Sequence, residues 1–301
     1  MMTALASVSE IAARCGVTAE TGHTLAEFTT IGVGGPVACL LKPDTIEAMG
    51  KLLAGLREAG FSPRLLGGGA NLVGGPDPIT DPVILTRGIK HGPIFEGTRV
   101  RAGCGVVVKK LVLKCVQAGL AGLEFAEGIP GTVGGTVWMN AGSYGGQMSD
   151  VVRETAHFNA QGEFLCRTVT ASDFSYRKSP FLPGDVIVEV VFHLTPADPV
   201  MLAARVKETS GRRLKSQPPG ERSAGCVFKN PAGDSAGRLI DSLGLKGLAV
   251  GGASVSQAHG NFIVNRGDAS PNDVLGLIDL IKKRVRERSG ITLEEEVIIW
   301  S

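Results

Sequence analysis

EFAEGIPGTVGGTVWMNAGSYG, residues 124–145, is the stretch around which the rest of the chain is organised. Its six glycines add no side chain to a core, and glycine loses more backbone entropy on folding than other residues. Such a loop lets the backbone pass close to a ligand and points N–H groups at an anion. We therefore predict a nest for a large phosphate-bearing ligand; the alternative is a glycine-rich turn in a β-rich protein.

The stretch does not match the dinucleotide fingerprint of nucleotide-binding α/β folds. That motif is G-x-G-x-x-G between a strand and a helix, with an acidic residue about 20 residues later. Here Trp138, Met139, Asn140 and Tyr144 follow the glycines, and we expect no helix there. A dinucleotide would therefore bind on a different scaffold.

Two more glycine-rich loops come earlier in the chain, GVGG at 32–35 and GGG at 67–69. The GGG loop follows a predicted strand at 64–66. That strand completes a βαβ unit, whose first strand is at 37–42 and whose helix begins at the capping-box pattern Asp44-Thr45-Ile46-Glu47. These strands are expected to be parallel, with a right-handed crossover. An α/β unit places its ligand at the carboxyl end of a strand, which is where the GGG loop lies. Three such loops in the first half of the chain are easier to explain by one extended ligand than by three unrelated turns.

Hydrophobic periodicity and turn residues predict the remaining elements. Residues 1–20 are expected to form a short helix or a loose arm. Ser270, Pro271 and Asp273 give the last helix an N-cap, a proline at its first position and a capping acid, and Gly290 is expected to end it. The other predicted segments are helices at 106–117 and 200–209, and strands at 83–85, 100–102, 156–159, 164–167, 186–194 and 291–300.

Composition limits the class of protein. The chain has 301 residues, 43% hydrophobic and 20% charged, which suits a soluble protein of two or three domains. A net charge of +2 predicts no strong attraction to nucleic acid or membrane. We expect no secretory signal, no membrane span and no metal site, because the six cysteines form no C-x-x-C pair and no metal-like spacing with the five histidines. A cytoplasmic location with reduced thiols follows.

Three polar stretches in the second half carry candidate chemistry: DFSYRKS at 173–179, SAGCVFKNP at 223–231 and LEEEV at 293–297. Each is weak evidence alone. Arg177 could be a surface charge, Cys226 a buried thiol and Glu296 a solvated carboxylate.

Together with the glycine loops, these stretches resemble the UDP-N-acetylenolpyruvoylglucosamine reductase family, in its compact type without a long insert. The resemblance covers residues 23–300. The motifs that carry it are GVGG at 32–35, LGGGxNL at 66–72, GLxxLEFAxGIPGxVGG at 119–135, MNAGxYG at 139–145, FxYRxS at 174–179, AGxVFKNP at 224–231 and LxxEV at 293–297.

The resemblance implies an α+β fold: an FAD-binding part of the vanillyl-alcohol-oxidase type, then a smaller α+β substrate-binding domain. The expected boundaries are 20–87 and 88–210 for the two FAD-binding subdomains and 211–301 for the substrate-binding domain, whose last strand returns to the active site.

The resemblance also implies the reaction. An NADPH-dependent flavoenzyme with noncovalent FAD would reduce the enolpyruvyl ether of UDP-N-acetylenolpyruvoylglucosamine to UDP-N-acetylmuramate for peptidoglycan synthesis. NADPH would reduce the flavin and leave, and the sugar nucleotide would then occupy the same cavity. Hydride would pass from flavin N5 to the terminal carbon of the ether, and a proton to the neighbouring carbon. A monomer or weak oligomer is expected.

By this resemblance, three matched positions would supply the catalytic roles. Arg177 would be a fixed cation for the substrate carboxylate and the developing enolate. Cys226 would be the proton donor, at a position where the family commonly has serine. Glu296 would polarise the enolate or assist proton transfer; strand alternation is expected to place it on the face of Ile298 and Trp300, where partial burial would raise its pKa.

Ala70 departs from the family's usual serine and removes one possible hydroxyl contact to the flavin pyrophosphate.

The matched binding positions form two sets. The expected substrate-binding residues are Tyr176, Asn230, Lys246, Arg213 and His259, of which the last two are the weaker matches. The expected cofactor-binding residues are Gly67, Gly68, Gly69, Asn71, Leu72, Gly128, Ile129, Gly131, Thr132, Gly135, Asn140 and Ala141.

Two rival interpretations remain at this point. One is a different FAD oxidase or dehydrogenase on the same scaffold, although no histidine for covalent flavin attachment lies within the glycine loops. The other is a nucleotide-binding relative with little or no turnover; Arg177 and Glu296 argue against it, whereas Cys226 keeps it open.

Overall fold

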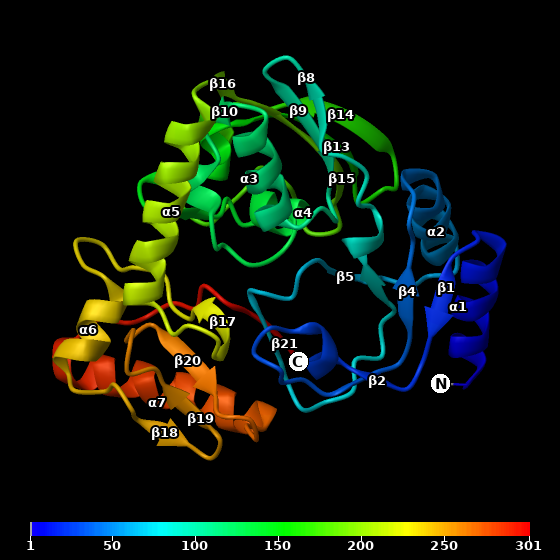
Figure 1. Ribbon diagram of the computed structural model, residues 1–301. Coiled ribbons are helices and arrows are strands. Elements are labelled where there is room, and N and C mark those ends of the chain that lie inside the picture. The colour runs from blue at the N-terminus through cyan, green and yellow to red at the C-terminus, as the bar shows by residue number, and fades with distance from the viewer. Residues whose placement is uncertain (1) are drawn as a thin grey trace. The chain divides into compact units, whose positions relative to one another are not determined.

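The computed structural model describes residues 2–301, and the chain in it divides into two compact units (Figure 1). Each unit is built from separate segments of the sequence. The three-part division into 20–87, 88–210 and 211–301 stays a prediction. The first unit comprises the residues up to Thr21, Cys39–Gly68 and Asp81–Gly211, and the second comprises Gly22–Ala38, Gly69–Thr80 and Arg212–Ser301.

A four-stranded sheet and two helices form the N-terminal part of the first unit. They are α1 (Met2–Arg14), β1 (Thr18–Glu20), β4 (Leu40–Lys42), α2 (Ile46–Glu58), β5 (Arg64–Leu66) and β7 (Val83–Leu85). The strand order is β1-β4-β7-β5. β4 and β5 each pair in parallel with β7, which lies between them, so their parallel direction is as predicted.

Helix α2 begins one residue later than its sequence pattern suggested. Thr45, not Asp44, is the N-cap, and its Oγ1 accepts a hydrogen bond from the Ala48 N–H at 3.0 Å. Glu47 therefore cannot complete a capping box; it forms an ion pair with Lys51 one turn later, at 2.6 Å.

A five-stranded antiparallel sheet forms the rest of the first unit. Its strand order is β14-β13-β15-β9-β8, and the short helix α4 packs against β15 and β9. The elements here are β8 (Ile94–Glu96), β9 (Arg99–Gly103), α3 (Val108–Gln117), α4 (Val133–Trp138), β13 (Val152–Phe158), β14 (Phe164–Thr168) and β15 (Val186–His193), with two small hairpins, β10 (Leu120–Ala121) with β16 (Thr195–Pro196) and β11 (Gly142–Ser143) with β12 (Gly146–Gln147).

The second unit has a four-stranded antiparallel sheet of order β17-β20-β19-β18. Helix α7 packs against β18 and β19 and also contacts α6 (Figure 1). The elements are α6 (Ala236–Ser242), α7 (Pro271–Ser289), β17 (Arg222–Cys226), β18 (Ala249–Val250), β19 (Ala253–Val255), β20 (Phe262–Asn265), and the pairs β2 (His23–Thr24) with β3 (Pro36–Val37) and β6 (Leu72–Gly74) with β21 (Ile298–Trp300). Helix α5 (Pro199–Ser216) contributes residues to both units.

The start and end signals predicted for the last helix are confirmed in α7. The Ser270 Oγ accepts from the Asp273 N–H at 3.2 Å, and an Asp273 oxygen accepts from the Ser270 N–H at 2.8 Å, which is a complete capping box. Pro271 is the first helical residue, and Gly290 ends the helix with φ +71°. Its buried face consists of Val274, Leu277, Ile278, Ile281 and Val285.

Two expectations about local structure are wrong. A six-residue helix, α4, directly follows the glycine-rich loop, where no helix was expected. The predicted strand at 291–300 is reduced to β21, because residues 293–297 make scattered main-chain hydrogen bonds to Val227 and Lys229 instead of a continuous ladder. Glu296 precedes β21, so the alternation argument for its orientation does not apply.

None of the helices within residues 2–301 is both long and apolar enough to cross a membrane. The same residues contain no group of three or more His, Cys, Asp or Glu side chains that could hold a metal ion.

Candidate active site

In the first unit, two of the predicted glycine-rich loops pack backbone against backbone. A Cβ atom on Gly68 would lie 2.4 Å from the Gly131 Cα, and one on Gly67 would lie 3.0 Å from the Thr132 Oγ1. Gly128 and Gly131 also have positive φ, +72° and +114°, which side chains rarely adopt. Glycine at Gly68 is therefore needed for the contact between the loops.

Several main-chain amides of the glycine-rich stretch 124–145 donate hydrogen bonds within the protein. The N–H of Ile129 donates to the Ala126 carbonyl, and that of Gly134 donates to the Cys104 carbonyl at 2.8 Å. The Val133 N–H donates to a further main-chain carbonyl at 2.9 Å. These three amides hold the loop in place, so an anion would have to use other N–H groups.

Arg87 supports the glycine loop at 67–69 and was not found by sequence reasoning. Its Nε donates to the Gly67 carbonyl at 2.8 Å, and burial lowers the pKa of its half-buried guanidinium. In a trans peptide the next N–H points away from the carbonyl. By holding the Gly67 oxygen on one side, Arg87 turns the Gly68 N–H to the opposite side.

Thr132 gives the most direct sign that this region suits a ligand. Its hydroxyl oxygen is buried and has no hydrogen-bond partner among residues 2–301. Leaving such a group unsatisfied costs about 1–3 kcal/mol, which a hydrogen bond to a ligand would offset. With the bare backbone of the adjoining loops, these residues fit a phosphate-bearing cofactor such as FAD.

Asn140 lies two residues after the end of α4 and is almost fully buried, with φ +42°. Its Nδ2 donates to the Ser175 carbonyl at 3.1 Å and to the Gln147 Oε1 at 3.3 Å, and its Oδ1 accepts from the Ser149 N–H at 3.0 Å. The expected cofactor ligand therefore makes its hydrogen bonds to the protein. Ala141 follows it, and Gly135 is part of α4.

Arg177 lies in a tight turn of the first unit. The main chains of Ser175 and Lys178 exchange two N–H···O bonds, at 3.0 and 3.1 Å, and Arg177 has φ +57°. Its guanidinium carbon lies 4.9 Å from the centre of the Tyr176 ring, and this ring is half exposed. The turn therefore brings two predicted site residues into direct contact.

In the second unit, Asn71 directly precedes β6 and binds the segment that carries Glu296. Its Nδ2 donates to the Glu296 carbonyl at 3.0 Å, and its carbonyl accepts from the Ile298 N–H at 2.9 Å. The next residue, Leu72, is buried and is paired with Ile298 in the parallel β6–β21 contact. Nearby in sequence, Gly69 accepts a hydrogen bond from the Thr30 N–H.

Cys226 ends β17 and is half-buried. The Glu296 N–H donates to the carbonyl of Val227, the residue after Cys226, at 2.8 Å. The structure thus brings the backbones of two predicted catalytic residues together in this unit. Arg177 belongs to the other unit.

The predicted substrate-binding residues of the second unit have identifiable roles in its structure. The Asn230 Oδ1 accepts from the Ala236 N–H at the start of α6. Lys246 forms an ion pair with Asp241 at 2.7 Å. Arg213 lies in α5 and donates to Gln217 at 2.9 Å.

His259 lies in the same region. Its Nδ1 accepts from the Asn261 N–H at 3.1 Å, and its ring meets the Phe262 ring edge-on. Burial lowers the pKa of His259, with a further contribution from the charge of Lys246. It is therefore held neutral as a loop-supporting residue in this structure.

Sequence reasoning also missed two buried asparagines of this unit. The Asn261 side chain both donates to and accepts from the Phe228 main chain. The Asn265 Nδ2 donates to the Ile31 carbonyl at 2.9 Å and ties the main chain just before the GVGG loop at 32–35 to β20. Neither has a local sequence signal, because both bonds join distant segments.

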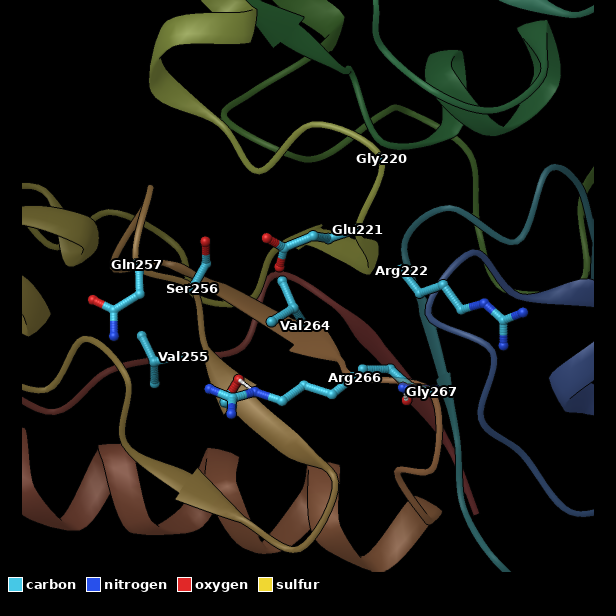
Figure 2. A pocket seen from close by; sticks show the side chains of 11 residues that line it. Gly220, Glu221, Arg222, Val255, Ser256, Gln257, Val264, Arg266 and Gly267 are labelled. Atoms are coloured by element: carbon cyan, nitrogen blue, oxygen red, sulfur yellow. Dashed lines mark hydrogen bonds between the residues drawn. The ribbon is translucent and has the colours of Figure 1, made fainter.

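One cavity of about 610 Å³ lies along the β17, β20 and β19 strands, lined by residues 220–222, 254–257 and 264–267 (Figure 2). Arg266 crosses it, and its Nε donates to the Ser254 Oγ at 2.8 Å. The Glu221 side chain lies above Val264 in this view. The lining offers hydrogen-bond donors and acceptors, and it includes both acidic and basic side chains, which suits a polar ligand.

Known proteins resemble the chain over most of its length. A family model described as "UDP-N-acetylenolpyruvoylglucosamine reductase, C-terminal domain" matches residues 217–300, and one described as "FAD binding domain" matches residues 36–166. The UDP-N-acetylenolpyruvoylglucosamine reductase of Geobacter metallireducens is 42% identical over 275 residues, 91% of each chain. That of Bacillus subtilis is 38% identical over 279 residues, again 91% of each chain.

A solved structure agrees. The crystal structure of UDP-N-acetylenolpyruvylglucosamine reductase from Thermus caldophilus matches with a TM-score of 0.79 and 38% identity, over 95% of this chain and 99% of that one. The predicted fold class, an FAD-binding α+β region followed by a smaller α+β domain, is confirmed. The chain belongs to the UDP-N-acetylenolpyruvoylglucosamine reductase family.

Proposed function

We infer that this protein is an FAD-dependent oxidoreductase that uses NADPH to reduce the enolpyruvyl ether of UDP-N-acetylenolpyruvoylglucosamine to UDP-N-acetylmuramate, a step of peptidoglycan precursor synthesis. The observation that carries this proposal is the similarity over 91% of the chain to enzymes named for that reduction. The match of residues 36–166 to an FAD-binding model supports the cofactor.

Bound FAD would relay hydride between NADPH and the substrate. The chain's own contribution begins with holding that cofactor. We place its pyrophosphate against the packed glycine loops, where Thr132 offers an unsatisfied hydroxyl and Arg87 orients the Gly68 N–H. Asn71 and Asn140 support neighbouring main chain in this structure, so we propose that both act mainly through those segments.

Arg177 is the proposed partner of the substrate carboxylate. Addition of hydride to the terminal carbon leaves negative charge on the enolate conjugated with that carboxylate. A guanidinium fork binds such a group with two parallel hydrogen bonds and stabilises the charge as it develops. The double hydrogen bond between Ser175 and Lys178 limits the freedom of its turn.

Cys226 is the proposed proton donor to the neighbouring carbon. A cysteine thiol has an ordinary pKa of about 8.5, so it is protonated at neutral pH and is far more acidic than a serine hydroxyl. It can therefore take over the serine's role, and solvent can return its proton after each turnover.

Glu296 is proposed to assist that transfer. Its main chain is hydrogen-bonded to Val227, so the carboxyl and the thiol lie on neighbouring backbone segments of one unit. A protonated Glu296 carboxyl would donate to the enolate oxygen or pass a proton toward Cys226; that it is protonated stays a prediction.

The UDP moiety is proposed to contact Lys246, Asn230, Tyr176 and, with weaker support, Arg213 and His259. Lys246 would exchange its Asp241 partner for a phosphate oxygen. Asn230 uses its Oδ1 within the protein and can offer its Nδ2. The polar cavity beside β17 and β20 would offer further hydrogen-bonding surface to the sugar nucleotide.

We further propose that the protein acts in the cytoplasm as a monomer or weak oligomer, with the UDP-linked enolpyruvyl sugar as its main partner. The domain boundaries 20–87, 88–210 and 211–301 belong to the same proposal.

The test is a turnover assay with purified holoenzyme. We expect NADPH oxidation that depends on UDP-N-acetylenolpyruvoylglucosamine, with UDP-N-acetylmuramate identified as product by mass spectrometry. Substrate-independent NADPH oxidation without that product would favour a different flavoenzyme. A protein that binds the sugar nucleotide without turnover would favour the nucleotide-binding alternative.

A further inference from the structure

Three non-glycine residues within 2–301 have positive φ: Asn140 at +42°, Tyr144 at +50° and Arg177 at +57°. Residues with a Cβ avoid this region, so the surrounding contacts must hold them there. The side chain of one of these residues, Asn140, donates a hydrogen bond to Ser175, the first residue of the turn that carries Arg177. Arg177 occupies the third position of a four-residue turn, where positive φ favours glycine or asparagine.

The carbonyl of Ser175 is the link. It accepts one hydrogen bond from the Lys178 N–H, which closes the turn, and another from the Asn140 Nδ2, both at 3.1 Å. A carbonyl oxygen has two lone pairs, so this oxygen is saturated. The exposed turn that carries Arg177 is thereby fixed to a buried side chain.

Asn140 is itself held firmly. Its N–H donates to the Val137 carbonyl at the end of α4, and its Oδ1 accepts from the Ser149 N–H. α4 begins directly after the glycine-rich loop, with Thr132 as N-cap. A continuous rigid path thus runs from that loop through α4 to the turn.

A second contact runs between the same two segments. The Trp138 ring of α4 stacks on the Phe181 ring, with centroids 6.5 Å apart and planes 20° apart. Phe174 and Phe181 are buried on either side of the turn. Packing fixes the two ends of the segment, whereas Asn140 alone among these contacts reaches the main chain of the turn itself.

We propose that Asn140 is a positioning residue for Arg177 and not a ligand of the cofactor. This inference rests on the proposed function, in which Arg177 binds the substrate carboxylate. Asparagine suits the position because it tolerates positive φ and offers a donor and an acceptor at once. Aspartate keeps the acceptor for Ser149 but has no donor for Ser175; glycine keeps the backbone angle and has neither.

The test compares Asn140→Gly and Asn140→Asp holoenzymes with wild type in two half-reactions measured separately. Flavin reduction by NADPH is expected to stay within about twofold of wild type, and flavin reoxidation by the enolpyruvyl sugar nucleotide to slow about 10- to 100-fold, because small misplacements of a binding group have such effects. The double variant Asn140→Gly/Arg177→Gln is expected to be no slower than Arg177→Gln alone, within about twofold.

A matched control is Asn159→Gly. The Asn159 Oδ1 supports the exposed β13–β14 turn by accepting hydrogen bonds from the N–H groups of Gln161 and Glu163. Asn159 has no proposed role in binding or chemistry, so both half-reactions should be unchanged. Additive effects of the two substitutions, an equal loss in both half-reactions, or loss of FAD or of folding from both Asn140 variants would overturn the inference. If wild-type flavin is not reoxidised by the sugar nucleotide, the proposed function fails instead.

Discussion

The Asn71 side-chain amide donates a hydrogen bond to the Glu296 main-chain carbonyl, with an N···O distance of 3.0 Å across 225 positions of sequence. The Asn71 carbonyl closes the contact by accepting from the Ile298 N–H. Asn71 therefore places the C-terminal segment that carries a proposed catalytic carboxyl. A motif residue predicted to bind the cofactor thus has a structural role that the motif alone does not reveal.

Replacing Asn71 by alanine is expected to lower the free energy of unfolding by about 1–2 kcal/mol, because the Glu296 carbonyl loses a partly buried donor. Chemical denaturation measures this. Asn272→Ala, at an exposed position in the first turn of α7, is the control and is expected to change stability by less than about 0.5 kcal/mol. Equal effects of the two substitutions would contradict the role given to Asn71.

Cys226→Ala is expected to leave flavin reduction by NADPH near normal and to slow reoxidation by the enolpyruvyl substrate at least about 100-fold, as expected for loss of a proton donor. Cys226→Ser should restore much of that rate. Cys166→Ala removes an exposed thiol of β14 and is the matched control. Stopped-flow absorbance separates the half-reactions; an equal fall in both for Cys226→Ala would remove Cys226 from proton transfer.

Gly68→Ala should destabilise the protein by about 3 kcal/mol or more, because the new methyl group would meet the Gly131 Cα at 2.4 Å and backbone cannot rotate away. We also expect FAD content to fall. Gly211→Ala, inside α5 with no atom within 4 Å of the added Cβ, should instead stabilise by about 0.5–1 kcal/mol. Thermal unfolding and flavin absorbance test both, and a Gly68→Ala protein as stable as wild type would contradict the loop packing.

The buried His157 and the half-buried His259 predict a pH dependence of stability. Burial lowers the pKa of His157 and of His259 below the ordinary value of 6.5. The unfolded chain therefore binds more protons than the folded protein just below pH 6.5, and the free energy of unfolding falls as the pH drops through that range. His157→Leu should flatten part of this slope in denaturation curves taken from pH 7 downward. An unchanged slope would show that the pKa of His157 does not differ between the folded and unfolded states.

The sequence predicted best the elements with strong local signals. The capping box, first-position proline and terminal glycine of α7 all appear in the structure, as do the parallel strands of the βαβ unit. Such signals depend on residues a few positions apart, so they can be read without knowledge of the fold.

Tertiary packing explains the errors. α4 contains two glycines and has low helix propensity, but a Cβ on Gly134 would lie 2.8 Å from the Cys104 Cβ, and the Gly134 N–H donates to the Cys104 carbonyl. This close contact with Cys104, the residue after β9, thus stabilises a helix that local propensity disfavours. Arg87 and Asn265 were missed for the same reason, since each supports a loop distant in sequence.

Motif order identified the family, and with it the candidate site. The positions of Arg177, Cys226 and Glu296 follow from that resemblance and not from any local chemistry. What the sequence could not convey is how each is held: the positive φ of Arg177, the bond from Asn71 and the register irregularity before Cys226 all depend on the folded chain.

The most direct test of the central claim is an anaerobic absorbance titration of the purified protein. We predict an oxidised flavin band that NADPH bleaches and that UDP-N-acetylenolpyruvoylglucosamine, added without oxygen, restores in proportion to the amount added. A flavin that NADPH bleaches and the sugar nucleotide leaves bleached, or a colourless protein that cannot be reconstituted with FAD, would contradict the account.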